Sequence, residues 1–303
     1  MRKTNFKIVG KWRIWFTFSM AIIILGLGFM ATKGLNMGID FAGGTSVVIE
    51  MGSDFNKADV DAVVKKYDTN AVSSKVNGTQ LELRSQSLDT ENTANLVAEL
   101  KTAYKLSENP VISESTIGAA IGAEQTSGGI KAVLIASLLM LIYISFRFRF
   151  NFALAAIIAL LHDILITLSV YAIFQIPLNT PFIAAVLTIL GYSINDTIVI
   201  FDRIRENLKS NKHKTPEAVA DQSINQSITR SINTLATTLF TIVAVYVFVP
   251  AVRDFALPIT IGIISGGYSS TFIASPVWTM LEKKMIEKHT AKKKAPFKAA
   301  KAK

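Results

Sequence analysis

Long stretches without charged residues alternate with short charged segments along most of this 303-residue chain. A helix needs about 20 mainly apolar residues to cross the hydrocarbon core of a bilayer. The apolar stretches therefore predict six membrane-spanning helices, at residues 14–33, 129–148, 150–175, 181–202, 231–252 and 255–281. The third and fourth come from one region that is too long for a single span, and the turn-like sequence IPLNTP, which contains Pro177 and Pro181, divides it.

Two of these spans need a further argument. The second has only residues 132–146 free of charge, but Lys131 can extend its ammonium group toward the membrane surface while the helix begins a turn earlier. The first could be a secretory signal peptide. Its apolar part is longer than that of a signal peptide and no A-x-A-like cleavage site follows, so a membrane anchor is the better interpretation.

Residues 34–128 show shorter periodicities. The segments at 45–51, 71–76, 80–85 and 111–116 read as strands, and 54–67 and 89–106 as amphipathic helices, the first with Asp54 as its cap. Asn77-Gly78 between the second and third strands is a strong hairpin signal. The β-α-β-β-α-β order predicts a small ferredoxin-like domain. The fold class is thus a mainly α membrane protein, a six-helix bundle with an α+β extracytoplasmic domain.

Composition supports a membrane protein and narrows the chemistry. Half of the residues are hydrophobic and only 18% are charged, whereas a soluble chain has about a quarter charged residues. Cysteine is absent, which excludes disulfides, and three scattered histidines make no metal cluster. The outer domain has no motif that pairs a nucleophile with a base. We therefore expect no cofactor, no metal and no enzymatic activity, and a binding or lever role for this domain.

The charge distribution predicts the orientation. The segments 1–13, 147–149, 203–230 and 282–303 hold 22 Lys and Arg against five Asp and Glu, while the other side holds ten basic and 14 acidic residues. Basic residues favour the cytoplasmic side. Both termini are therefore expected in the cytoplasm, with 203–230 as a basic loop, 282–303 as a disordered tail and 34–128 outside. The net charge of +10 then reflects topology and attraction to anionic lipid rather than nucleic-acid binding.

Two carboxylates lie inside predicted spans. An ionisable side chain near a helix centre costs about 2.5 to 3.5 kcal/mol on insertion scales, so such residues are functional candidates. Asp196 lies in the fourth span, six residues before Asp202 and nearer the cytoplasm, with Ser193 and Asn195 as polar neighbours. Asp163 lies deeper in the third span. Whether Asp163 is functional or only a packed polar residue stays open.

The fifth span supplies a matching cation. Ser227, Arg230, Thr234, Thr237 and Thr241 recur at helical spacing and form one polar face. If the fourth and fifth spans pack together, Arg230 could reach Asp196, and a pair that forms and breaks would act as a proton switch. Two simpler interpretations remain: a static ion pair, or an arginine placed at the cytoplasmic side by the positive-inside rule.

Glycines mark two further places. Gly38, Gly43 and Gly44, with Asp40 among them, follow the first span, where they supply unusual backbone angles or close approach, or act as a hinge. The sixth span contains a face of small residues that serves either packing within the chain or contact with a partner. Its members are Gly262, Ser265, Gly266, Gly267, Ser269 and Ser270.

The segments GIDFAGGT at 38–45 and GYSINDTIVIFDRIREN at 191–207, together with LHDILIT at 161–167, strongly resemble the SecF family of bacterial protein-export subunits. This resemblance covers the whole chain. It implies the RND transporter fold, a cytoplasmic-membrane location and a role that uses the proton motive force late in translocation, after SecA has acted. It also implies that Asp196 and Arg230 occupy the positions proposed to carry protons in that family.

The resemblance further implies partners. RND-type bundles need twelve spans and this chain has six, so SecD is expected to supply the other half. The further expected partners are the SecYEG channel, the translocating preprotein, membrane lipids and YidC. Nucleic acid is not expected as a partner. Two alternatives stay open: a stand-alone proton-coupled exporter of small molecules or lipids, and a purely structural subunit. A membrane hydrolase is disfavoured, because His162 is adjacent to Asp163 and neighbouring helix positions do not face each other.

Overall fold

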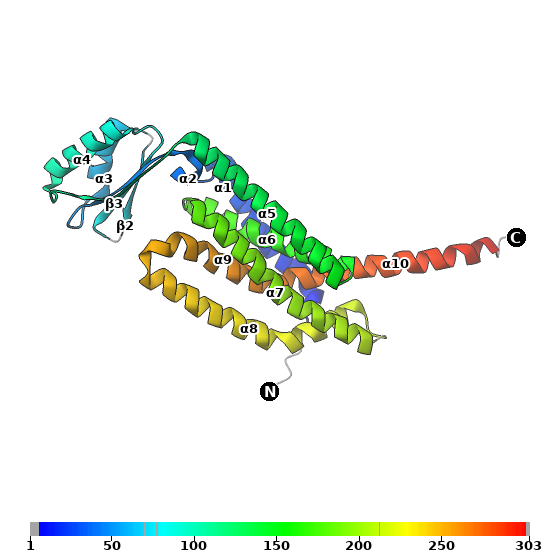
Figure 1. Cartoon of the computed structure of the whole chain (residues 1–303). Coiled ribbons are helices and arrows are strands. Elements are labelled where there is room, and N and C mark those ends of the chain that lie inside the picture. The colour runs from blue at the N-terminus through cyan, green and yellow to red at the C-terminus, as the bar shows by residue number, and fades with distance from the viewer. Residues whose placement is uncertain (1–5, 70, 77, 212, 301–303) are drawn as a thin grey trace. The chain divides into compact units, whose positions relative to one another are not determined.

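The computed structural model describes residues 6–300 except 70, 77 and 212, without the side chains of residue 251 and of residues 289–300. The chain forms two compact units (Figure 1). The helical unit comprises Met1–Gly34, Ala132–Gln175 and Pro181–Lys303, and the α+β unit comprises Leu35–Lys131 and Ile176–Thr180.

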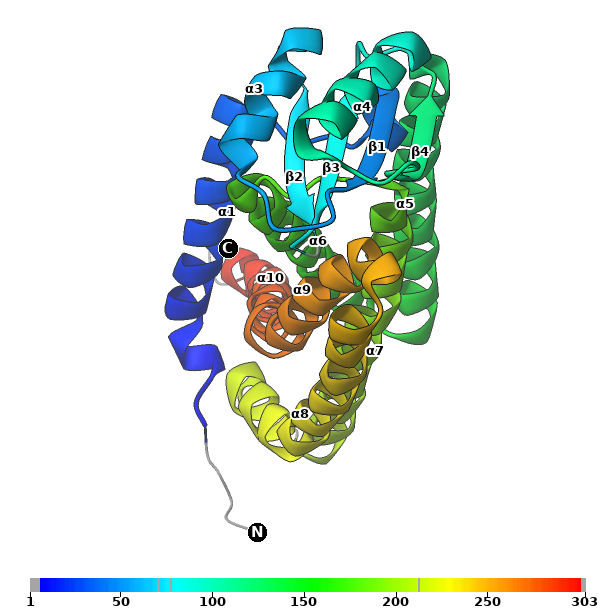
Figure 2. The same ribbon diagram turned by 90° about the vertical axis from the view of Figure 1, so that its left-hand side faces the viewer.

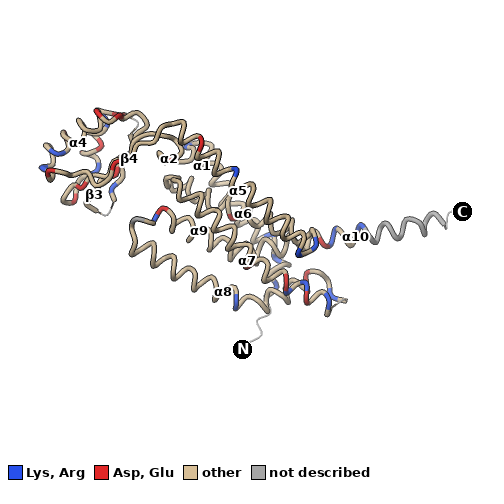
Figure 3. The backbone as a smooth tube through the Cα atoms, viewed as in Figure 1, with Lys and Arg blue, Asp and Glu red and all other residues tan. Residues whose placement is uncertain are grey.

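Six helices of the described chain are long and apolar enough to cross a membrane, as the hydrophobic pattern predicted. They are α1 (Trp12–Lys33), preceded by the short helix η1 (Val9–Lys11), then α5 (Ala119–Arg147), α6 (Phe150–Phe174), α7 (Thr180–Ser210), α8 (Pro216–Phe248) and the continuous helix Arg253–Lys288, which begins with α9 (Arg253–Ser269). From α9 the chain continues through a π-helical segment, η3 (Ser270–Ala274), into α10 (Ser275–Ala300). Most of their length carries no charged residue (Figure 3).

Two segments differ from the prediction. Most of 203–230 is helical rather than a loop, because α7 ends at Ser210 and α8 begins at Pro216, with the Thr215 side chain capping α8. The tail predicted to be disordered continues α10 to Ala300, and residues 301–303 lie outside the described part. Charge marks where a helix leaves lipid, not where it ends, and lysine and alanine are good helix formers.

Contacts between helices show their relative directions. Ser19 and Gly26 of α1 meet His162 and Ser169 of α6, so both helices advance by seven residues between contacts and run parallel. This spacing is typical of side-by-side packing at a small crossing angle. Parallel first and third spans are what a chain that crosses the membrane repeatedly requires.

The remaining pairs follow the same alternation. On α9, Gly262 and Gly266 lie against Ile189 and Ser193 of α7, which makes these two helices parallel. Against α8, α7 runs antiparallel, because Asp196 contacts Ser231 while Asn207, further along α7, contacts the earlier Ser223. The small-residue face of the sixth span therefore packs within the chain.

The N-terminal segment is held against α8. Asp221 of α8 accepts hydrogen bonds from the backbone N–H groups of Ile8 and Val9, both at 2.9 Å. The amide of Asn225, one turn on, pairs with the backbone of Phe6. These bonds satisfy donors at the start of η1 that have no partner within the helix.

The α+β unit has the predicted ferredoxin-like topology. Its elements are the short helix α2 (Ile39–Ala42), β1 (Gly44–Glu50), α3 (Lys57–Tyr67), β2 (Val72–Val76), β3 (Gln80–Ser85), α4 (Thr90–Tyr104) and β4 (Val111–Ile117). The antiparallel sheet has the order β2-β3-β1-β4, and α3 and α4 cover one of its faces (Figure 2). Alternate residues of the central strands, such as Val47 and Leu83, pack under the two helices.

Two local predictions in this unit have different outcomes. Asn56, not Asp54, caps α3, since its side chain accepts from the backbone N–H of Ala58. Asp54 instead forms an ion pair with Lys75. The β2–β3 hairpin is present, but Asn77 of its expected turn lies outside the described residues.

Candidate functional site

Asp163 of α6 is fully buried and surrounded by hydroxyl donors. The Oγ atoms of Ser193 on α7 and Ser265 on α9 donate to it at 2.6 Å each, and Ser269 on α9 donates at 2.8 Å. A charge in a low-dielectric interior is tolerated only when it is hydrogen-bonded. Three serines from two other helices thus provide a cage for one carboxylate in the middle of the bundle.

His162 adds a fourth contact, which the sequence argument had excluded. Its Nδ1 lies 3.1 Å from the Asp163 carboxylate and its Nε2 lies 2.8 Å from Ser19 Oγ on α1. Backbone positions i and i+1 point in different directions on a helix, but an imidazole is long enough to turn back toward its neighbour. The polar group at Asp163 therefore extends through the His162 imidazole to α1.

Asp196 of α7 is less enclosed than Asp163, being only partly buried. Ser231 Oγ on α8 donates to its Oδ1 at 2.6 Å, and Ser270 Oγ at the start of η3 donates to its Oδ2. Both of the predicted carboxylates thus lie in one cluster of polar side chains from α6, α7, α8 and the α9–η3 helix. Asp163 and Asp196 share the same type of partner but differ in burial.

The predicted pairing of Asp196 with Arg230 is not present. The Arg230 side chain is exposed, and over the described residues no ion pair involves it. Ser231, the next residue along α8, occupies the place that Arg230 was expected to take. One residue on a helix turns the side chain by about 100°, so a spacing argument alone could not choose between the two.

Of the four polar residues predicted to support the carboxylates, one belongs to the cluster and three do not. Ser193 belongs to the cluster, although it donates to Asp163 rather than to its helix neighbour Asp196. Asn195, Thr234 and Thr237 are exposed, and the Thr237 hydroxyl donates to backbone carbonyls of its own helix. Within the described part of the chain, Thr234 and Thr237 thus make no hydrogen bond to either carboxylate, whereas Ser227 of the same predicted face is buried.

The sequence reasoning missed four serines of the cluster: Ser231, Ser265, Ser269 and Ser270. Three of them had been noted only as small residues in the sixth span. Ser265 and Ser269 lie one turn apart, and a hydroxyl in lipid needs an acceptor. That signal could have identified them as carboxylate partners.

The glycine segment after α1 makes close contacts within the α+β unit. Gly43 and Gly44 have φ of +76° and +122°, and a Cβ on Gly44 would lie 2.3 Å from the carbonyl oxygen of Ser85. A Cβ on Gly38 would lie 1.8 Å from the Asn179 side chain. Asp40 accepts from the backbone N–H of Thr180 at 2.6 Å. These contacts support the packing interpretation of the glycines, while a hinge role stays a prediction.

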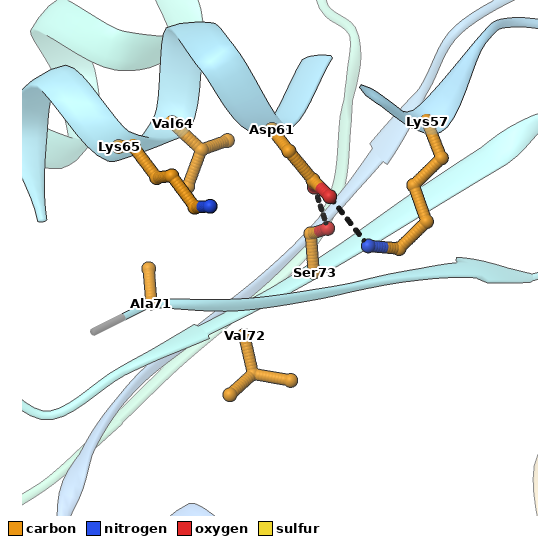
Figure 4. Close-up of a pocket in the computed structure, with 7 residues that line it drawn as sticks. All are labelled: Lys57, Asp61, Val64, Lys65, Ala71, Val72 and Ser73. Atoms are coloured by element: carbon orange, nitrogen blue, oxygen red, sulfur yellow. Dashed lines mark hydrogen bonds and ion pairs between the residues drawn. The ribbon is translucent and has the colours of Figure 1, made fainter. Parts of the chain in front are cut away.

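A separate small pocket of about 210 Å³ lies between α3 and β2 (Figure 4). Asp61 accepts hydrogen bonds there from Lys57, at 2.6 Å, and from Ser73. Burial raises the pKa of Asp61, but these hydrogen bonds outweigh burial and hold it below its ordinary value. The hydrogen bonds that Asp61 accepts from Lys57 of α3 and Ser73 of β2 thus connect α3 to the sheet at this pocket.

Six membrane-length helices in the described part of the chain, and a ferredoxin-like unit that follows the first of them, define a multi-pass membrane protein with carboxylates inside its helical bundle. Residues 97–284 match the family described as "Protein export membrane protein SecD/SecF, C-terminal", and residues 28–54 match the "SecD/SecF GG Motif". The chain belongs to the SecF family of protein translocase subunits.

Relatives support this assignment over nearly the whole chain. The SecF translocase subunit of Sebaldella termitidis is 38% identical over 287 residues, which cover 92% of each chain. That of Alicyclobacillus acidocaldarius is 36% identical over 302 residues, covering 97% of this chain and 98% of the relative. Proteins of this family are transport subunits, which confirms that the chain is not an enzyme.

Solved structures give the same result for the fold. The crystal structure of SecDF from Thermus thermophilus has a TM-score of 0.84 and 32% identity, over 92% of this chain and 39% of that one. SecDF in a super-membrane-facing form has a TM-score of 0.71 and 31% identity, over 95% of this chain and 40% of that one. The chain thus spans about two fifths of the SecDF chains it matches.

Proposed function

We propose that this chain, together with SecD, uses the proton motive force to promote late preprotein translocation through SecYEG, after SecA has acted. The observation that carries the proposal is Asp196, a partly buried carboxylate in a membrane helix that accepts hydrogen bonds from Ser231 and Ser270. Such a carboxylate can take up and release a proton without dismantling the bundle. Membership of the SecF family supplies the process to which that proton movement would be coupled.

Asp163 and Asp196 suit different roles. Asp163 is fully buried and accepts from three serines, so loss of its charge would leave several donors to be rearranged. Asp196 has fewer donors and is more exposed. We assign proton exchange with solvent to Asp196, and transfer within the bundle to Asp163.

Arg230 fits the broken state of a switch. It lies beside Ser231, which contacts Asp196, yet its own side chain is exposed. A guanidinium that approached Asp196 would stabilise the ionised carboxylate and favour release of its proton. One charge that crosses 100 mV yields about 2.3 kcal/mol, which is enough to bias a two-state element.

SecD is the expected partner, and the location is the bacterial cytoplasmic membrane with both termini in the cytoplasm. Two facts support SecD: the matched SecDF chains are more than twice as long as the part this chain covers, and α5 and the apolar part of α8 leave most of their residues exposed. SecYEG, the preprotein, YidC and anionic lipids are the remaining partners of this proposal.

The test follows completion of a preprotein trapped midway across SecYEG vesicles by removal of ATP, under an imposed proton gradient. The vesicles contain SecD and this chain, either unchanged or with Asp196→Asn. We expect the substitution to abolish gradient-driven completion while the complex still assembles. The matched control is Asp202→Asn, because Asp202 lies on the same helix but pairs with Arg147 and Arg205.

Unchanged completion with Asp196→Asn would refute the role of this carboxylate. Export of a small solute by the chain without SecYEG would favour the stand-alone exporter instead. The names of the relatives support translocation over that alternative.

A further inference from the structure

Two adjacent serines reach two different carboxylates. Ser269, the last residue of α9, donates to Asp163 at 2.8 Å, and Ser270, the first residue of η3, donates to Asp196. Both serines are fully buried. The two acidic groups, which lie on different helices, are therefore joined through a single peptide unit of a third helix.

Each serine also has a second acceptor in reach. Ser269 Oγ lies 3.3 Å from the carbonyl oxygen of Gly266, and Ser270 Oγ lies 3.2 Å from that of Gly267. A hydroxyl carries one proton and donates one hydrogen bond at a time. Each serine can therefore donate either to its carboxylate or to its own backbone without leaving a buried donor unsatisfied.

The backbone changes at this point from α-helical to π-helical, over Ser270–Ala274. The hydroxyl of Ser275 donates to the carbonyl oxygen of Ser270, five residues earlier, at 3.2 Å. Single π-helical turns within α-helices occur frequently at functional sites. The pair of serines thus lies at the junction between the α-helical and the π-helical segment.

The surroundings contain few other groups that could connect the carboxylates. Asp163 contacts Ser193 of α7, Ser265 of α9 and its own neighbour His162, which in turn contacts Ser19 of α1. Asp196 contacts Ser231 of α8. Over the described residues, no Lys or Arg forms an ion pair with either carboxylate.

We propose that Ser269 and Ser270 are positioning residues that couple the protonation of Asp196 to the protonation of Asp163. Ionised Asp196 accepts from both Ser231 and Ser270, but a protonated carboxyl group becomes a donor on one oxygen and loses an acceptor position. Ser270 then turns to the carbonyl of Gly267, and the peptide unit it shares with Ser269 carries the change to Asp163. This inference deepens the proposed function and rests on it.

The experiment reads the carboxylates directly. A hydrophobic carbodiimide reacts with protonated carboxyl groups in membranes, and peptide mass spectrometry reports labelling at each aspartate. We would label the full complex with SecD in vesicles across a pH series and determine the pH of half-maximal labelling of Asp163. The variants are Asp196→Asn, Ser269→Ala with Ser270→Ala, and all three substitutions together.

We expect Asp196→Asn to move the midpoint for Asp163 by about half a pH unit or more when both serines are present. With both serines replaced by alanine, the same substitution should move it by less than half as much. Ser275→Ala is the matched control, since it removes an equally buried hydroxyl from the same segment whose partner is a backbone carbonyl. Ser265→Ala removes a donor to Asp163 alone and should leave the shift in place.

An equal shift with and without the two serines would overturn the proposal, since the carboxylates would then interact directly through space. No shift in the chain with both serines, or no labelling of Asp163 at any pH, would also overturn it. If the alanine variant fails to assemble, Ser270→Cys keeps the side-chain shape, with a somewhat larger atom and a much weaker donor, and should reduce the shift. These outcomes do not depend on translocation, so a failure of the proposed function is seen separately, in the completion assay with Asp196→Asn.

Discussion

Replacing Gly26 with alanine tests the close contact between α1 and α6 that holds Ser19 against His162. A Cβ on Gly26 would lie 2.2 Å from Ser169 Cβ and 2.6 Å from Ser169 Cα. Carbon atoms in contact are normally at least about 3.5 Å apart, so the overlap is at least about 1.3 Å. Because one of the atoms is backbone, a change of rotamer cannot relieve it, and the two helices must separate.

The magnitude follows from two opposing effects. Overpacking a tight site costs about 1 to 3 kcal/mol, and a clash with backbone belongs at the upper end of that range. Alanine gains about 1 kcal/mol over glycine in a helix interior. We therefore expect a net loss of about 2 kcal/mol in the free energy of unfolding, a change of about thirtyfold in the ratio of folded to unfolded protein.

The matched control is Gly28→Ala, two residues away on the same helix, where a new Cβ would meet nothing within 4 Å. Unfolding of both variants in mixed micelles, titrated with a denaturing detergent, gives their stabilities relative to the unchanged chain. Ser169→Gly removes two of the three closest atoms, so it should restore part of the stability lost with Gly26→Ala. Equal stability of the two alanine variants would refute the packing of α1 against α6 described above.

Three further predictions concern other parts of the chain. Gly44→Ala should destabilise the α+β unit by about 3 kcal/mol or more, because it combines a positive φ with a backbone clash. Gly52→Ala has a positive φ but open space around the new Cβ, so it should cost about 1 kcal/mol. Equal hydrogen exchange of the α+β unit in the two variants would contradict this. Asp221→Ala should lower the protection of the Ile8 and Val9 amides by about fivefold, because it removes a cap worth about 1 kcal/mol. Unchanged exchange of these amides would show that the cap is dispensable. Because the pKa of Asp61 is lowered in the folded state, ionised Asp61 stabilises the fold fully above its unfolded pKa of 3.8, and this contribution is lost as the pH falls through the lower folded pKa. The protection of α3 amides against hydrogen exchange, normalised to intrinsic exchange, should fall over that pH range. It should fall less steeply in Asp61→Asn.

Much of the fold could be read from local patterns. Each of the six spans follows from a run of apolar residues, because lipid requires such a run wherever a helix crosses it. The ferredoxin-like unit follows from periodicities of two and 3.6 residues, and its core residues Val47 and Leu83 alternate as a half-buried strand requires. The ends of the helices were harder to predict from the sequence, because α7 and α10 continue as helices beyond the apolar runs.

The candidate site was likewise only partly predictable from the sequence. Asp163 and Asp196 were found from the sequence, because a carboxylate in an apolar run is costly and therefore conspicuous. Their partners were not, because a serine costs little in a membrane helix and resembles the small residues that let helices approach. Arg230 was chosen for its charge, whereas the structure brings the neutral Ser231 to Asp196.

The sequence by itself thus determined which segments are apolar enough to cross the membrane, which unit lies between the first two spans and which two carboxylates lie within spans. These depend on the composition of contiguous segments, and lipid or a sheet face selects for them locally. Only the tertiary structure decided which face of α8 meets α7, and that Ser269 and Ser270 divide between two acidic groups. The rotation of one helix about its axis is set by packing against all of its neighbours at once, and no single segment of the chain contains that information.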